Sequence, residues 1–503
     1  MVIGKLPKLC ARRYPNKKAT VFQGSSQTFA QFNTRVNQLC SVFRAHGLSK
    51  GAKVATLLRN CPEVMEICMA TAKMGIVLVP INFRLVPAEL KFVINDAGID
   101  LLFWGDAFKK EISAIRNDIQ VKHTLSLADE YENLLAEASS EELELQVSPD
   151  DLFAIFYTSG TTGGPKGVML THDNFLSAAI NHVIAYQLGP NDVCLHVMPL
   201  YHTMEASMMI CQFYVGGTNV IVDAFDADEF WKLVDSEKLT HLTLVYPMLR
   251  DIIDVYKEKG YVRGTFRHFS IGGQTTPTQI MKEALETFGA GSVFPVYGLT
   301  EASPLLTYLP REDMVINGEK SRLLGSVGKE LFSCHVRVVN DEDRDVTSGE
   351  MGEIIAQGPN VMKGYWKREK ETQEALAGGW LRTGDVGTLD NEGYLYIIDR
   401  KKELIISGGE NISPHEIEEV LYKHSAVAEC AAIGVPDERW GEQVKAVVVL
   451  KLGETVSEKD LIQFARENLA AYKCPRSVDF VEDLPKDPVG KIQKRVLQQQ
   501  YSQ

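Results

Sequence analysis

The segment best equipped for chemistry is residues 157–167, Tyr-Thr-Ser-Gly-Thr-Thr-Gly-Gly-Pro-Lys-Gly, which follows an apolar stretch. Its glycines let the backbone approach a polyanion and turn N–H groups toward it, while hydroxyls and one lysine add donors and charge. The order Pro165-Lys166-Gly167 departs from the P-loop pattern G-x-x-x-x-G-K-[ST], and a flexible surface loop would not need it. We therefore expect a different phosphate-binding loop. Its expected contacts are Thr158, Ser159, Gly160, Thr161, Thr162, Gly163 and Lys166.

This loop resembles the phosphate loop of the adenylate-forming superfamily, which contains acyl-CoA synthetases, luciferases and nonribosomal adenylation domains. Similar motifs of that superfamily follow in its order, from about residue 29 to residue 496. One motif is weak support, but six in order are specific. The further motifs are PLYHT at 199–203, YGLTE at 297–301, WLRTGD at 380–385, DRKKELIISGGENISPHEIE at 399–418 and PKDPVGK at 485–491.

The resemblance implies an ATP-dependent acid–thiol ligase that forms an acyl-adenylate and then an acyl-CoA. Its implied cofactors are ATP, Mg²⁺ and coenzyme A, and its other partner is a carboxylic acid. The carboxylate must attack the α-phosphorus of ATP, so negative charge meets negative charge. Cations and hydrogen-bond donors must therefore be preorganised at that point.

The same resemblance implies roles for individual residues. Lys491 would bridge the carboxylate and the α-phosphate, Thr300 would contact the α-phosphate, and Glu301 would bind Mg²⁺. Asp385 would hold both ribose hydroxyls, and Arg400 would reach the ribose or a phosphate. Taken alone, a Thr-Glu or Gly-Asp pair is more often a turn or a helix cap. Only the ordered set of motifs makes these positions expected site residues.

Other expected site residues border the adenine and the acyl group. By resemblance, Tyr297 stacks on adenine. His202 is expected to be an aromatic gate beside the acyl carboxylate rather than a general base, although a lone histidine there is more often structural. Residues Gly272, Gly273 and Gln274 resemble the superfamily's strand end, whose backbone is expected to border both the adenine and the acyl pocket.

The two half-reactions need different surroundings, so one site must be rebuilt between them. The resemblance implies rotation of the C-terminal domain about Lys402, after which Gly409 leaves room for pantetheine. A tight turn between strand and helix is the alternative explanation for Gly409. Acylation of Lys491 would remove the charge that adenylation needs, which makes this lysine a possible point of regulation.

The substrate is the least determined feature. Acetyl-CoA synthetases have a pocket-blocking tryptophan where this chain has Gly298, so we expect a medium- or long-chain fatty acid. The pattern is most similar to bacterial fatty-acyl-CoA synthetases, and o-succinylbenzoate–CoA ligases and other aryl-acid ligases remain alternatives. A carrier-protein acyl ligase and a luciferase-like oxygenase would keep the same motifs. A non-catalytic nucleotide binder should lack the lysine that is present at 491.

The expected fold is α/β: a large N-terminal domain of two α/β subdomains plus a small β-barrel-like subdomain, then a small mobile α+β C-terminal domain. We expect the domains to span residues 1–399 and 400–503. Polar residues 106–150 are expected to form a surface helix and linker, and a second α/β unit is expected to begin at the strand 152–157. Short alternating runs at 326–398 predict the β-rich part.

Composition restricts the partners. The 503 residues carry a formal charge of −13, which disfavours nucleic acid and anionic membranes. Nine scattered cysteines lack metal-ligand spacing and favour a reducing cytoplasm. No secretory signal and no transmembrane segment are expected, because no apolar run approaches the roughly 18 residues that a spanning helix needs. The oligomeric state is not readable, and a homodimer stays open.

Overall fold

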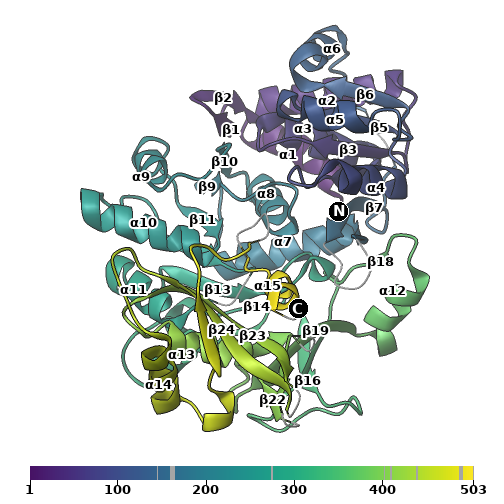
Figure 1. Cartoon of the computed structure of the whole chain (residues 1–503). Coiled ribbons are helices and arrows are strands. Elements are labelled where there is room, and N and C mark those ends of the chain that lie inside the picture. The colour runs from purple at the N-terminus through teal and green to yellow at the C-terminus, as the bar shows by residue number, and fades with distance from the viewer. Residues whose placement is uncertain are drawn as a thin grey trace.

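The structure, a computed structural model, describes residues 1–143, 146–158, 165–273, 276–400, 403–407, 410–437, 440–486 and 491–501, with only the backbone at 400, 410 and 411. The N-terminal part contains two α/β units and a β-rich unit, and a smaller C-terminal lobe packs on it (Figure 1). This arrangement agrees with the predicted fold class. None of the helices in the described ranges is long and apolar enough to cross a membrane.

The first sheet has seven strands in the order β18-β8-β7-β4-β3-β5-β6. Its central strands β7, β4, β3 and β5 are parallel neighbours, and they are apolar because helices cover both faces. The strands are β3 Lys53–Leu57, β4 Val77–Pro80, β5 Leu101–Trp104, β6 His123–Ser126, β7 Leu152–Thr158, β8 Lys166–Thr171 and β18 Gly364–Tyr365.

The second sheet has nine strands in the order β15-β14-β13-β12-β11-β9-β10-β1-β2. The strands from β13 to β1 run parallel, and β2, β14 and β15 add antiparallel edges. They are β1 Lys18–Phe22, β2 Ser25–Thr28, β9 Val193–His196, β10 Thr218–Ile221, β11 His241–Leu244, β12 His268–Ile271, β13 Val293–Tyr297, β14 Thr307–Tyr308 and β15 Lys329–Glu330.

Helices separate and cover the two sheets, which gives five layers. The largest apolar core joins both sheets to helices of the middle layer, a second core joins the second sheet to α9–α11, and a third joins the first sheet to α4 and α5. The middle-layer helices are α1 Leu6–Arg13, α2 Phe29–Ala45, α3 Pro62–Met74, α7 His172–Tyr186 and α8 Thr203–Val215. The outer helices are α4 Pro87–Ala97, α5 Lys109–Ile115, α9 Ala227–Ser236, α10 Tyr246–Lys259 and α11 Thr278–Phe288.

Two expectations about the α/β units were wrong. The strand at 152–157 does not begin the second unit, because β7 pairs with β4 in the first sheet. Residues 106–150 are not only a helix and linker, because β6 extends the first sheet and Glu142 pairs with buried Lys73. Both errors concern pairings between residues far apart in sequence, which a local pattern does not contain.

The β-rich unit and the C-terminal lobe follow the second sheet, as predicted. Strands β16 His335–Val339, β17 Gly352–Gln357, β19 Leu381–Leu389 and β20 Leu395–Arg400 form an antiparallel sheet, and α12 Glu369–Ala375 lies between β17 and β19 in the chain. The lobe has two apolar cores of its own. Its elements are β21 Ile405–Ser407, β22 Glu410–Ile412, α13 Pro414–Leu421, β23 Val427–Asp437, β24 Gly441–Leu450, α14 Glu458–Asn468, β25 Ser477–Phe480 and α15 Lys494–Tyr501.

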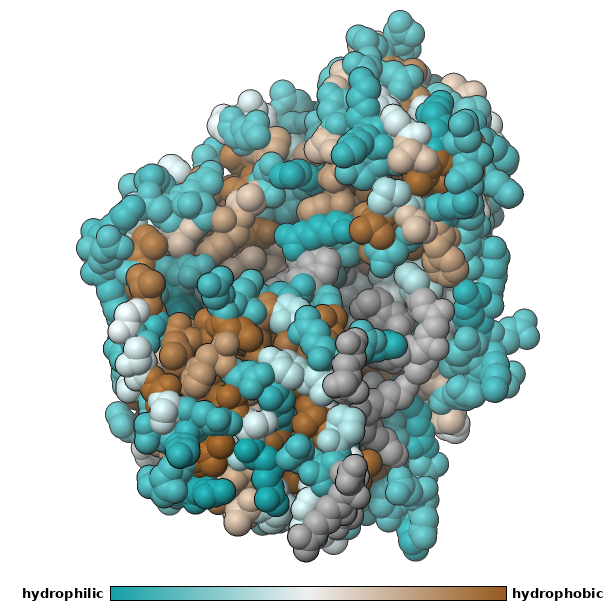
Figure 2. All heavy atoms as spheres, in the orientation of Figure 1, coloured by the Kyte–Doolittle hydropathy of each residue, from teal (hydrophilic) through white to brown (hydrophobic). Residues whose placement is uncertain are grey.

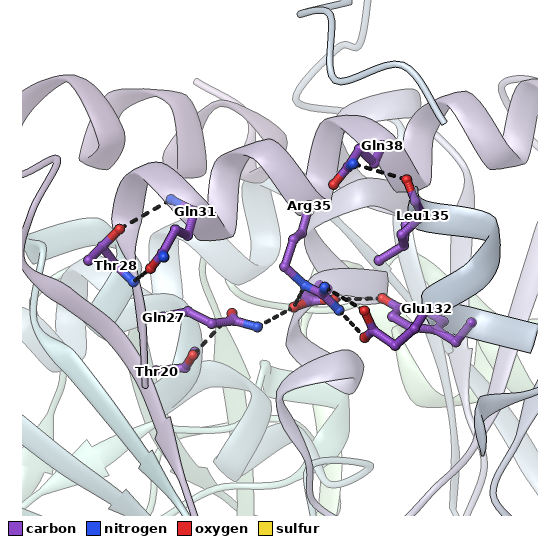
Figure 3. A network of polar contacts seen from close by, with 10 residues as sticks. Thr20, Gln27, Thr28, Gln31, Arg35, Gln38, Glu132 and Leu135 are labelled. Carbon is purple, nitrogen blue, oxygen red and sulfur yellow. Dashed lines mark hydrogen bonds and ion pairs between the residues drawn. The ribbon is translucent and has the colours of Figure 1, made fainter. Parts of the chain in front are cut away.

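A buried polar network fixes α2 in the middle layer (Figure 3). Glu66 is 0% exposed and accepts hydrogen bonds from Arg35 Nε at 2.7 Å, from the Tyr131 hydroxyl at 2.7 Å and from Gln27 Nε2 at 2.8 Å. Arg35 also donates to both oxygens of Glu132, whose side chain is 66% exposed. The network therefore neutralises a carboxylate that has no contact with water.

Arg35→Leu should destabilise the fold by about 3–5 kcal/mol, because it leaves Glu66 buried without its cation. Glu132→Gln should cost about 0–1 kcal/mol, since that partner is exposed. Urea unfolding monitored by circular dichroism measures both. A double Arg35→Leu/Glu66→Gln variant should recover much of the loss. Equal stability of Arg35→Leu and wild type would contradict this assignment.

Candidate functional site

A cavity of about 180 Å³ lies between the N-terminal part and the C-terminal lobe. The space-filling view, drawn in the orientation of Figure 1, shows a hollow in the visible face of the molecule (Figure 2). The cavity is lined from one side by Gly273, Tyr297, Gly298 and Asp385, and from the other by Lys491. Residues from several of the sequence motifs and from both lobes therefore line one cavity.

Asp385 and Tyr297 are joined directly in the cavity wall. Asp385 lies on β19, and its Oδ2 accepts a hydrogen bond of 2.7 Å from the hydroxyl of Tyr297 at the end of β13. The backbone of Asp385 lies opposite Arg400 of β20. This contact orients the carboxylate and the aromatic ring relative to each other, and both residues are at least 91% buried, with 8% and 9% exposure.

Glu301 lies near the described end of the glycine-rich loop. Its Oε1 accepts a 2.8 Å hydrogen bond from the hydroxyl of Tyr365 on β18, and the ammonium of Lys166 lies 5.3 Å from the centre of the same ring. β18 pairs with β8, the strand that begins at Lys166. Burial raises the pKa of Tyr365, and the charge of Glu301 raises it further, so the phenol stays protonated. Tyr365 thus links the loop to the carboxylate.

Thr300 and His202 belong to two motif segments that contact each other, although neither residue lines the cavity described above. The Oγ1 atoms of Thr300 and Thr203 lie 3.5 Å apart, which brings the YGLTE and PLYHT segments together. Burial lowers the pKa of His202 to about 4, and the charge of Arg84 contributes to this shift. The ring is therefore neutral at pH 7, which agrees with an uncharged aromatic role rather than a cationic one.

The glycines of the site are explained by close packing and backbone conformation. Gly273 has a φ of +85°, which favours glycine, and a Cβ on Gly272 would lie 2.8 Å from Val296 Cγ2. A Cβ on Gly298 would lie 2.0 Å from the carbonyl oxygen of Pro304. The expectation that the missing side chain of Gly298 opens room for the acyl chain is therefore wrong. The space that a side chain would enter is occupied by the backbone of the following residues, where Leu306 N donates a hydrogen bond of 2.8 Å to Tyr297 O.

The two lobes are held together around the cavity by polar contacts. The hydroxyls of Tyr246 and Tyr422 lie 2.9 Å apart. Glu419 of the C-terminal lobe accepts hydrogen bonds of 3.0 and 3.1 Å from the N–H and Oγ1 of Thr278, the first residue of α11. Arg250 donates to the carbonyl of Ala428 at 3.0 Å. These contacts fix the lobe in the orientation that places Lys491 at the cavity.

Several predicted positions lie outside the described residues. Thr158 and Lys166 are described and are paired across β7 and β8, so they form the base of the loop. The positions outside the description are Ser159, Gly160, Thr161, Thr162, Gly163, Gln274, Lys402, Gly409 and the side chain of Arg400. No group of three or more His, Cys, Asp or Glu side chains suited to a metal occurs within the described ranges.

The sequence interpretation missed four residues at or beside the site. Tyr365 is the middle residue of a short Gly-Tyr-Trp run, which has no distinctive pattern. Glu419 and Tyr422 look like ordinary residues of an amphipathic helix, and their role at the lobe contact depends on α10 and α11, which are far away in sequence. Lys494 looks like one cation of a basic tail, although it lines the cavity with Lys491.

Comparison with known proteins identifies matching families over most of the chain. Residues 8–366 match the family described as AMP-binding enzyme, and residues 416–491 match the AMP-binding enzyme C-terminal domain. The chain is 36% identical to a feruloyl-CoA synthase of Amycolatopsis over 99% of both chains. It is 36% identical to the long-chain-fatty-acid–CoA ligase FadD13 of Mycobacterium tuberculosis over 94% of this chain and 93% of that one. It is 35% identical to a 2-succinylbenzoate–CoA ligase of Bacillus anthracis over 96% of both.

Solved structures extend the similarity to the whole fold. ATP-bound MatB from Rhodopseudomonas palustris is 30% identical, with a TM-score of 0.90 over 100% of this chain and 99% of that chain. Apo MatB from the same organism is 31% identical and has a TM-score of 0.79, also over 100% of this chain and 99% of that chain. The chain is therefore more similar in overall shape to the ATP-bound form than to the apo form.

Proposed function

Because this chain belongs to the AMP-binding enzyme family and is an AMP-forming acyl-CoA synthetase, we propose that its acid substrate is a medium- or long-chain fatty acid. The enzyme uses ATP, Mg²⁺ and coenzyme A. The observation that carries the proposed site is the cavity in which Lys491 of one lobe lines the same space as Asp385 and Tyr297 of the other. We assign residues 1–399 to the AMP-binding domain and residues 400–503 to the C-terminal domain.

Lys491 is the proposed catalytic cation. An ammonium on a flexible stem can contact both the acyl carboxylate and the α-phosphate, and its charge offsets the repulsion between these anions. Thr300, which lies against Thr203, would donate to the α-phosphate. The greater similarity to ATP-bound than to apo MatB supports an orientation of the lobe suited to this half-reaction. Thioester formation would then require the lobe to move, with Lys402 as the proposed pivot and Gly409 beside pantetheine.

Asp385 and Tyr297 form the proposed nucleoside contact. The carboxylate of Asp385 can accept hydrogen bonds from both hydroxyls of a ribose, and the Tyr297 hydroxyl bond holds it in place. The ring of Tyr297, which lines the cavity, is large and flat enough to stack on adenine. The backbone at Gly273 and the neutral ring of His202 would border the adenine and the acyl carboxylate. Arg400, Gln274 and the 159–163 segment complete the proposed contacts.

Glu301 suits a magnesium ion held mainly by phosphates. Mg²⁺ usually keeps water and binds through one or two carboxylates plus phosphate oxygens, so a single carboxylate is a sufficient protein ligand. The ion would supply charge that neutralises the phosphates. Tyr365 leaves Glu301 acceptor capacity because it occupies only Oε1 in the described contacts.

Tyr365→Phe should raise the Mg²⁺ concentration needed for half-maximal pyrophosphate release by about tenfold. The variant loses the hydrogen bond that orients Glu301, and a hydrogen bond to a charged group is worth ~1.5 kcal/mol. Tyr157→Phe is the matched control, because its hydroxyl donates to another carboxylate, Asp96, at 2.6 Å. A magnesium titration of pyrophosphate release measures both variants. The same magnesium requirement in wild type and Tyr365→Phe would remove Tyr365 from the proposed site.

Apolar surroundings support a fatty acid. The side chains nearest to where Cβ atoms of residues 272 and 273 would lie are Val296, Met204 and Val245, which offer neither charge nor a strong hydrogen bond to a substrate. The long-chain acid of FadD13 suits such a wall. Another relative is a feruloyl-CoA synthase, so an aryl acid is the second candidate substrate. A second carboxylate, as in 2-succinylbenzoate, would need a cation, and none of these three side chains is one.

A pyrophosphate-release screen over acids of graded length and aromaticity tests the substrate. We expect the largest kcat/KM among straight-chain acids of eight or more carbons, because each buried methylene adds about 0.8 kcal/mol. A preference for cinnamic-type acids, or for 2-succinylbenzoate, would overturn the fatty-acid assignment while leaving the ligase intact. Free coenzyme A as acceptor separates this activity from transfer to a carrier protein.

Two further expectations concern the protein in the cell. All nine cysteines are free, which supports a reducing compartment such as the cytoplasm. A homodimer is the proposed assembly. Size-exclusion chromatography with light scattering tests it, and a mass of one chain would refute it.

A further inference from the structure

The described residues on the two sides of positions 487–491 are joined to each other, and we call the paired residues 485–486 and 492–493 the Lys491 hairpin. Lys486 and Ile492 form an antiparallel bridge, and Gln493 N donates to Pro485 O at 2.7 Å. Ile492 packs on an apolar cluster that includes Leu484 and Leu497. Lys491 therefore follows a short segment whose two ends are joined by backbone contacts.

A lysine at each end of this hairpin is bound to a largely buried carboxylate. On one side Lys486 Nζ lies 2.8 Å from Glu429 of β23, whose side chain is 18% exposed. On the other side Lys494 Nζ lies 2.9 Å from Glu418 of α13, and the two side chains are 15% and 13% exposed. Glu418 also accepts a 2.8 Å hydrogen bond from Ala432 N of β23. Both ends of the segment are thus tied to the body of the lobe.

Lys494 is unlike an ordinary cation of a basic tail. It lines the same cavity as Lys491, only three residues away, and so does its partner Glu418. Burial lowers the pKa of Lys494, but the charges of Glu418, Asp399 and Glu403 together raise it by more, so the ammonium stays protonated. These neighbouring carboxylates balance the charge of Lys494. Its ammonium is bound to Glu418 within the C-terminal lobe, which indicates a structural contact rather than a ligand contact.

We propose that the ion pairs Lys494–Glu418 and Lys486–Glu429 hold the Lys491 hairpin in place, which makes Lys494 and Lys486 positioning residues for adenylation. This inference rests on the proposed role of Lys491. A catalytic cation must stay within a fraction of an ångström of its productive position, so loosening the base of its segment costs rate without removing the charge. We expect Lys494 to contribute more to this positioning than Lys486, because the Lys494–Glu418 pair is the more deeply buried.

The test compares variants in the two half-reactions separately. Lys494→Met should lower ATP–pyrophosphate exchange by about 10- to 100-fold, the scale of a misplaced reacting group. Coenzyme A thioester formation from supplied acyl-adenylate should stay within about twofold of wild type, because Lys491 is not proposed to act there. Lys494→Arg, which keeps the charge, should recover most of the exchange. Lys486→Met should show the same selective loss, smaller in size.

Lys473→Met is the matched control. Lys473 pairs with Glu416, also on α13, at 2.7 Å, but lies outside the hairpin. We expect both half-reactions of this variant to stay at the wild-type rate. Thermal unfolding of all variants identifies losses caused by global instability, and Lys494→Arg keeps the test valid if Lys494→Met folds poorly.

A double-variant cycle with Lys491→Ala decides whether Lys494 acts through Lys491. In the Lys491→Ala background, Lys494→Met should cause no further loss of exchange. Additive losses, or equal losses in both half-reactions, would show a general structural role and overturn the inference alone. Full exchange activity of Lys491→Ala would instead overturn the proposed function of Lys491, and the inference with it.

Discussion

Replacing Lys491 with alanine is expected to lower ATP–pyrophosphate exchange by about 10²- to 10³-fold, the range for losing one preorganised charge donor. The reason is that the ammonium lies in the cavity between the lobes, where two anions would have to meet. In water their repulsion is screened, but in an enclosed site a fixed cation is worth more. The rate of ATP–pyrophosphate exchange, measured with a saturating fatty acid and Mg-ATP, gives the size of the loss.

The control for this prediction is the second half-reaction. Thioester formation from supplied acyl-adenylate should continue in Lys491→Ala, because the phosphoryl chemistry is already complete. Thermal unfolding should be nearly unchanged, since Lys491 is only partly buried. Equal loss in both half-reactions would refute the assignment of Lys491 to adenylation.

Lowering the pH from 7.5 to 5 is expected to destabilise the fold strongly. Burial lowers the pKa of His172 and His202 to about 4 and of His182 and His241 to about 3. Their unfolded pKa is near 6.5, so the unfolded state binds more protons below that value. The stability that these neutral rings contribute is complete above pH 6.5 and is lost as the pH falls toward 4, by about 2 kcal/mol per histidine at pH 5.

Opposing pKa shifts of buried carboxyl groups reduce this loss. Burial raises the pKa of Glu66 and of Glu205, and their protonation favours the folded state at low pH. Urea unfolding across pH 5.0–7.5 measures the net effect as a positive slope of stability with pH. His182→Gln, which removes one of these buried rings, should lower that slope. A flat profile in both proteins would contradict this account.

Several residues that the sequence motifs singled out line one cavity, whereas the order of the strands was not predicted. The motifs that carry Asp385, Tyr297 and Lys491 predicted residues that do line one cavity. Such motifs are informative because each one places a chemical group in a short stretch of backbone. The order of strands was less predictable, since β7 pairs with β4 across about seventy residues of chain. Local apolar patterns are the same for a strand in either sheet.

Residues that act through others were missed for a similar reason. Tyr365 and Lys494 have no distinctive neighbours in sequence, and their partners Glu301 and Glu418 are 64 and 76 positions away. The interpretation of Gly298 failed because it considered the missing side chain and not the backbone of Pro304 that occupies its place. Close approach between strands is a property of the fold and not of the local sequence.

The most direct test of the central claim is a crystal structure with a non-hydrolysable acyl-adenylate analogue that carries a long alkyl chain. The account predicts that Lys491 Nζ lies within about 3.2 Å of the oxygens at the acyl–phosphate junction. It also predicts that the carboxylate of Asp385 contacts the ribose. An analogue bound elsewhere, or bound in this cavity with the lysine turned away toward solvent in every copy, would contradict it.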